Sequence, residues 1–173
     1  MKIGILSIYL HSNYGGILQV YALQTYLKNL GHDAIIIDGG RYSNPSLVKD
    51  FKKTIHWIMV EIKQRRFPHL HECSSFNHHN LTHFVSQHMK LLNKHDVKDI
   101  KAEEFDAIIV GSDQVWRKYP HVKDIAYYFL DFTSKWNIKR ISYAASFGSD
   151  EWQYSVEETG RCGDMLKKFS SIS

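Results

Sequence analysis

Residues 2–38 read KIGILSIYLHSNYGGILQVYALQTYLKNLGHDAIIID, and this stretch decides the fold. The run from Lys2 to Tyr9 is apolar without a helical stripe, which predicts a β-strand buried on both faces. From Gly15 the apolar residues recur at spacings of three and four, as in an amphipathic helix, and Gly31 stands where a C-terminal glycine cap is expected. A second buried strand is predicted at Ala34 to Asp38.

A strand, a helix and a strand in this order form a βαβ unit, which predicts a right-handed crossover and a parallel sheet. The fold class expected is therefore α/β, a Rossmann-like parallel sheet flanked by helices. The same kind of pattern continues along the chain, with a His-rich irregular stretch at 69–79. Further helices are expected at 51–66, around 81–89 and at 154–169, and further strands at 105–111 and 138–145.

The composition indicates an ordinary globular protein of one domain: 173 residues, 43% hydrophobic and 23% charged. A net charge of +4 is mild and spread out, apart from the basic cluster at 63–66, so a nucleic-acid partner is not expected. The two cysteines, Cys73 and Cys162, give neither a disulfide framework nor metal-ligand spacing. Because no long apolar segment or signal peptide is evident, we expect a cytoplasmic protein.

Two other features of the sequence each have a simpler interpretation. His79 and His83 stand at helical spacing near His78 and Cys73, but the chain lacks His-Glu-x-x-His, and solvated histidines rather than a metal site are expected. The helix predicted at 51–66 ends in basic residues and could lie on a membrane surface, although packing on the sheet is the commoner use of such a stripe.

Three polar segments follow predicted strands, and these are the candidate binding elements. In open parallel sheets ligands bind outside the carboxyl ends of the strands, so the three segments can converge on one cleft. They are His11 to Gly16 after the first strand, Ser112-Asp113-Gln114 after the strand at 106–111, and Ser146 to Ser149 after the strand at 139–145.

The first polar segment also opens a helix. The backbone N–H groups of Gly15, Gly16 and Ile17 are expected to face a ligand, with the helix dipole favouring an anion. Asn13 can equally be the N-cap of that helix, with the glycines giving only a tight turn. Neither Gly-x-Gly-x-x-Gly nor a P-loop motif is present, which removes the main support for a dinucleotide or P-loop site.

The second segment allows two interpretations as well. Ser112 and Asp113 suit a turn or a cap, while a carboxylate at a strand end also suits a general base or an acceptor of sugar hydroxyl protons. Trp116 is expected either to pack in the core or to form the aromatic floor of a sugar site. Spacing alone favours the cap and leaves Trp116 open.

Four blocks of the sequence resemble the amino-terminal half of the polysaccharide pyruvyl transferase family. They are the stretch from residue 1 to 38, FDAIIVGSDQVW at 105–116, YYFLDF at 127–132 and KRISYAASFG at 139–148. The match of order and spacing covers nearly the whole chain except the region 40–95.

The resemblance implies an enzyme that moves the enolpyruvyl unit of phosphoenolpyruvate onto two hydroxyls of a sugar, giving a ketal on a cell-surface or capsular glycan. It also implies similarity to the N-terminal domain of a GT-B fold. Residues 1–173 would then be the first domain of a two-domain enzyme, inactive alone, with most donor-binding cations in the second domain and another strand due after Ser170. No cofactor is implied beyond the donor substrate.

On this resemblance Asp113 is the expected catalytic residue. Asp113 would act on a hydroxyl of a sugar or lipid-linked glycan acceptor, at the cytoplasmic face of a membrane if the acceptor is lipid-linked. The other residues expected to bind substrate are Asn13, Tyr14, Gly15, Gly16, Gln19, Ser112, Gln114, Trp116 and Ser146. The alternatives are a GT-B glycosyltransferase that uses a nucleotide sugar, and a non-catalytic glycan-binding domain. Neither the acceptor sugar nor the oligomeric state follows from the sequence.

Overall fold

The computed structural model describes residues 1–8, 10, 13–38, 71–92, 99–118 and 124–173. Within them lies a four-stranded sheet in the order β2-β1-β3-β4, with every neighbouring pair parallel. The strands are β1 (Lys2–Ser7), β2 (Asp33–Asp38), β3 (Ala107–Gly111) and β4 (Lys139–Tyr143). The α-helices are α1 (Tyr14–Asn29), α3 (His71–His88) and α4 (Val156–Leu166), and the short 3-10 helices are η2 (Ala102–Glu104), η3 (Ile125–Phe129) and η4 (Asp131–Thr133).

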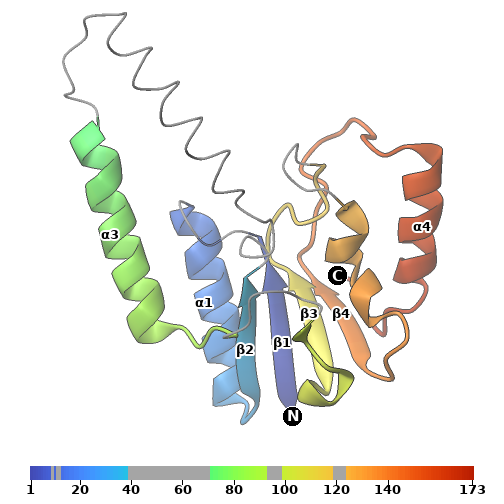
Figure 1. The fold of residues 1–173 in the computed structure, drawn as a ribbon, viewed down its shortest axis with the longest axis horizontal. Coiled ribbons are helices and arrows are strands. Elements are labelled where there is room, and N and C mark those ends of the chain that lie inside the picture. The colour runs from blue at the N-terminus through green and yellow to red at the C-terminus, as the bar shows by residue number, and fades with distance from the viewer. Residues whose placement is uncertain (9, 11–12, 39–70, 93–98, 119–123) are drawn as a thin grey trace, which may run out of the picture.

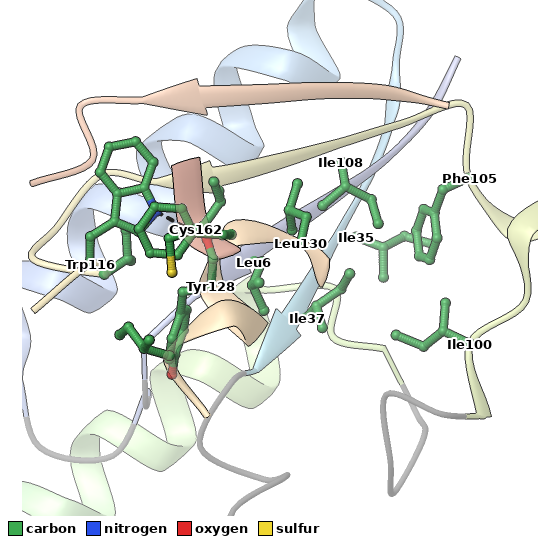
Figure 2. Packing of buried hydrophobic residues seen from close by; sticks show 14 of the residues in the cluster. Leu6, Ile35, Ile37, Ile100, Phe105, Ile108, Trp116, Tyr128, Leu130 and Cys162 are labelled. Atoms are coloured by element: carbon green, nitrogen blue, oxygen red, sulfur yellow. Dashed lines mark hydrogen bonds between the residues drawn. The ribbon is translucent and has the colours of Figure 1, made fainter. Parts of the chain in front are cut away.

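Both faces of the sheet are covered (Figure 1), which confirms the predicted Rossmann-like α/β fold. Successive strand residues alternate between the faces. Ile3 and Ile5 pack with buried residues of α1 and α3, whereas Leu6 packs toward η3 and α4. Figure 2 shows part of this second core, where Leu6 and Ile37 lie together with Trp116, Tyr128 and Leu130.

Helix α1 forms where the periodic pattern predicted it. Its buried stripe includes Ile17, Val20 and Leu27, which face the sheet. At its C-terminus Gly31 has a φ of +81°, and its N–H donates to Lys28 O at 2.9 Å. A residue in this left-handed conformation satisfies the last carbonyls of a helix, so the glycine cap is confirmed.

Short segments extend both edges of the sheet. Leu91 pairs in parallel with Ile36 of β2, and Ser171 pairs in parallel with Ile141 of β4. The second bridge lies where the sequence predicted the start of another strand.

Two sequence predictions fare differently in the region around α3. The stretch 71–79 was expected to be irregular, and this is wrong because its backbone is helical from His71. The helix predicted at 51–66 lies outside the described residues. Among the helices that the structure describes, none is both long and apolar enough to cross a membrane.

Candidate functional site

The carboxyl ends of β1 and β3 meet the start of α1, at the end of the sheet opposite the N-terminus (Figure 1). Asn13 is the N-cap of α1, and its Oδ1 accepts a hydrogen bond from Gly16 N–H at 3.2 Å. The Ile17 N–H donates to Asn13 O at 3.0 Å. The capping interpretation of Asn13 is therefore confirmed. The Gly16 and Ile17 N–H groups are therefore bonded to Asn13 and are not free to face a ligand, whereas the role expected for the Gly15 N–H stays a prediction.

Asp113 reaches across from β3 to this helix start. A Cβ built on Gly16 would lie 3.2 Å from Asp113 Oδ2, so the missing side chain at Gly16 makes room for the carboxylate. The other oxygen, Oδ1, accepts a hydrogen bond from Gln114 N–H at 2.7 Å. The positive end of the α1 dipole favours a negative charge here. Asp113 is half-buried, so its side chain packs against the protein and is also partly open to solvent.

The loops after β3 and β4 are joined through their backbones. Ser112 N–H donates to Tyr143 O at 2.6 Å, and Ser146 N–H donates to Asp113 O at 3.1 Å. A Cβ on Gly111 would lie 2.3 Å from Tyr143 O, so only glycine permits this approach. The loops after β3 and β4 therefore form one hydrogen-bonded unit that fixes the backbone of Asp113.

Backbone strain is concentrated at the same strand ends. Ser112 has a φ of +59° and Ala144 a φ of +48°, a left-handed conformation that side chains other than glycine rarely adopt. Each such residue costs about 1 kcal/mol or more and persists only when its surroundings enforce it. Gly148, at a φ of +63°, contacts Gln114, since an added Cβ would lie 2.4 Å from Gln114 Cδ.

Two buried serine hydroxyls near these strand ends have no hydrogen-bond partner among the described residues. Ser7 is fully buried, and its place after Ile3 and Ile5 in the strand alternation directs it toward the α1 face. Ser112 is buried directly before Asp113. Unsatisfied buried hydroxyls are unfavourable in a folded protein, and they are found where a water or a ligand completes the bonding. Sequence reasoning missed Ser7, although a serine within Ile-Leu-Ser-Ile at a strand end was the available signal.

Trp116 belongs to the core rather than to a binding surface. It is 5% exposed, its ring stacks on Phe129 at 5.1 Å between centroids, and its Nε1–H donates to Tyr128 O at 3.1 Å (Figure 2). Of the alternatives for this residue, the structure therefore gives the packing role.

The remaining predicted residues lie around the strand-end site. Tyr14, Gly15 and Gln19 are exposed on α1, and Ser146 is exposed on the loop that bonds to Asp113. Gln114 is half-buried, and its Oε1 accepts from the Arg117 guanidinium at 3.0 Å. The structure thus gathers Asn13, Gly16, Ser112, Asp113 and Gln114 and places the others at its periphery.

Arg140 on β4 is a buried cation that serves the scaffold. Its guanidinium donates to Thr133 Oγ1 at 2.8 Å and to Trp136 O at 2.9 Å, and burial lowers its pKa. With its donors committed to these oxygens, Arg140 fixes η4 against the sheet. Over the described part of the chain, no three His, Cys, Asp or Glu side chains are grouped as metal ligands.

Comparison with known proteins identifies the family. The family model described as polysaccharide pyruvyl transferase matches residues 13–173. Comparisons with curated proteins and with solved structures each found no match. The family match begins at the N-cap of α1 and includes both strand-end loops that hold Asp113. Because it spans nearly all of the sequence, the chain belongs to the polysaccharide pyruvyl transferase family.

Proposed function

We propose that this chain binds the acceptor sugar in a reaction that transfers the enolpyruvyl group of phosphoenolpyruvate to two sugar hydroxyls as a ketal. The observation that carries the proposal is the placement of the Asp113 carboxylate against the first turn of α1, at a strand-end site, in a member of this transferase family. A site at this edge of an open parallel sheet is where ligands of such folds bind.

The chemistry requires a proton acceptor beside the sugar. Protonation of the donor's methylene carbon gives its central carbon cationic character, the two hydroxyl oxygens bond to that carbon, and the phosphate leaves as inorganic phosphate. Of the two protons that the hydroxyls lose, one balances the proton gained by the methylene carbon and the other leaves with the phosphate; Asp113 is our candidate for the base that first accepts a hydroxyl proton. Its Oδ2 faces the helix start while Oδ1 is held by Gln114 N–H, so the carboxylate is fixed before a ligand arrives.

The neighbouring groups suit a sugar. The hydroxyls of Ser7 and Ser112 can both donate and accept, as sugar hydroxyls can, and both lack partners among the described residues. The Gln114 amide adds a further polar group. We therefore assign the acceptor to this chain and most of the cations for the donor's phosphate and carboxylate to a second, GT-B-like half. In this proposal the reaction takes place in the cytoplasm, at the inner face of the membrane if the acceptor is lipid-linked.

The test uses the full-length protein that contains residues 1–173. With phosphoenolpyruvate and a panel of neutral sugars, we expect release of inorganic phosphate together with an acid-labile pyruvate ketal on the sugar. A thermal-shift comparison with nucleotide sugars separates the glycosyltransferase alternative, which predicts stabilisation by the nucleotide sugar and no response to phosphoenolpyruvate. Stabilisation by sugars alone, with no turnover, would support a binding domain instead.

A further inference from the structure

Trp152, which the site described above does not use, is an exposed aromatic ring held in a fixed orientation. It is 60% exposed on the loop between β4 and α4, yet its Nε1–H donates to Thr159 Oγ1 at 3.0 Å. Its ring centroid lies 5.1 Å from that of Phe147 and 5.2 Å from that of Tyr154. A ring fixed in this way loses little side-chain entropy when a ligand stacks on it.

The anchors of Trp152 lead into the core. Tyr154 is buried, and its hydroxyl donates to Trp116 O. Phe147 contacts the Trp116 ring at 5.5 Å between centroids. The indole therefore rests on a packed aromatic group and is not a side chain free to turn.

The same loop connects Trp152 to the proposed reaction site. Phe147 lies between Ser146, whose N–H bonds to Asp113 O, and Gly148, which contacts Gln114. The indole contacts Phe147 directly. The loop that bonds to the Asp113 backbone therefore also carries the ring on which Trp152 packs.

The chemistry around the ring favours a carbohydrate over an apolar partner. Sugar rings present C–H faces that stack on aromatic faces, while their hydroxyls require polar neighbours. Exposed polar residues flank Trp152 along the loop: Ser149, Asp150, Glu151 and Gln153. The two carboxylates favour a neutral sugar over a uronic acid, because like charges repel.

We propose that Trp152 is a sugar-stacking subsite that binds a neutral unit of the acceptor glycan next to the unit that receives pyruvate. This proposal rests on the proposed function for the identity of the ligand as an acceptor. It adds a specificity determinant, since the enzyme would prefer an oligosaccharide to a single sugar.

Equilibrium binding without phosphoenolpyruvate tests the subsite. Full-length protein is titrated with neutral tetrasaccharides of gluco, galacto and manno configuration and with the matching methyl glycosides, using calorimetry. We expect at least one tetrasaccharide to bind more tightly than its methyl glycoside. Trp152→Ala should weaken that tetrasaccharide about 10-fold and leave the methyl glycoside unchanged. Trp152→Phe, which keeps an aromatic face, should retain most of the affinity.

Tyr26→Ala is the matched control, because Tyr26 is also an exposed aromatic residue, 62% exposed, but lies near the C-terminal end of α1, whereas Asp113 lies at the start of this helix. It should bind all sugars as the wild type does, and thermal unfolding should show that both alanine variants are folded. Equal tetrasaccharide affinity in Trp152→Ala and wild type, or no tetrasaccharide binding by wild type, overturns the proposal. Tetrasaccharide binding that depends on Trp152, without pyruvyl transfer, would reject the proposed function and keep the subsite. Pyruvyl transfer with tetrasaccharide binding that does not depend on Trp152 would support the proposed function and reject the subsite.

Discussion

Replacing Gln24 with methionine should lower the free energy of unfolding by about 3 kcal/mol. Gln24 is 1% exposed in the middle of α1. Its Nε2 donates to Ala34 O at 3.0 Å and to Lys90 O at 2.9 Å, and its Oε1 accepts from Lys90 N–H at 3.1 Å. Each bond contributes about 1 kcal/mol net, and methionine keeps the volume of the side chain, so no large cavity adds to the loss.

The loss of stability should be largest at the β2 edge of the sheet. Lys90 precedes the segment that pairs with β2, where Ile36 N–H donates to Lys90 O at 2.9 Å and Leu92 N–H donates to Ile36 O at 2.8 Å. Without the Gln24 amide this segment loses its two hydrogen bonds to α1 and keeps its backbone bonds to β2. Amide hydrogen exchange at Leu92 should therefore quicken more than exchange in the central strand β1.

Urea denaturation of wild type, Gln24→Met and Gln87→Met measures the effect. Gln87 is the matched control, because it is exposed on α3 and its amide nitrogen lies 3.2 Å from His83 Nε2. A change of at most about 0.5 kcal/mol is expected for this surface variant. If the two variants differ by less than about 1 kcal/mol, the Gln24 bonds do not stabilise the fold as reasoned.

Two further predictions concern the site and the core. Gly16→Ala places a methyl group 3.2 Å from Asp113 Oδ2 and should slow pyruvyl transfer by the full-length protein about 3- to 10-fold, since displacing a reacting group is expensive. Gly15→Ala adds a methyl group that meets only ordinary contacts and should leave the rate unchanged, and equal rates in both variants would contradict the placement of Asp113. Burial raises the pKa of the Cys162 thiol from 9.0 to about 11, so in a Cys73→Ser background the native protein at pH 8 should react with a disulfide reagent about 100-fold more slowly than in urea. Because the folded state favours the protonated thiol, the contribution of Cys162 to the free energy of unfolding should be complete below pH 9 and lost as the pH rises through 11. Comparable reaction rates of the native and unfolded protein would contradict the burial of Cys162.

The parts of the fold that sequence predicted are those fixed by local patterns. The apolar run of β1 and the three-and-four spacing of α1 each specify an element without knowledge of its neighbours. Gly31 likewise signals the end of α1 by its own conformational freedom. The parallel order of the strands then follows from connection rules.

Features that depend on distant partners were beyond such patterns. Gln24 breaks the apolar stripe of α1, but its partner Lys90 lies 66 residues further along the chain. The first half of α3 is rich in weak helix formers, and the helix is joined to the fold where Leu81 and Val85 pack against the α1 face. Spacing could not decide between floor and core for Trp116 either, because its neighbours come from η3.

The strand-end site was predictable in outline only. Open parallel sheets bind ligands at this edge, so Ser112 and Asp113 could be selected from their position after an apolar run. Their proximity to Gly16 depends on how the β3 loop reaches α1, which no local pattern encodes. Trp152 gave no sequence signal, since its exposure results from the path of the loop before α4.

The most direct test of the central claim is the rate of pyruvyl transfer by full-length Asp113→Asn, measured from phosphoenolpyruvate to the sugar acceptor. Asp164→Asn is the control, because Asp164 is exposed on α4 and pairs with Lys167 at 2.8 Å. If Asp113 takes the hydroxyl proton, its asparagine variant should lose at least about 100-fold in turnover while the Asp164 variant keeps the wild-type rate. Unchanged turnover in folded Asp113→Asn would show that Asp113 is a structural contact and has no part in the chemistry.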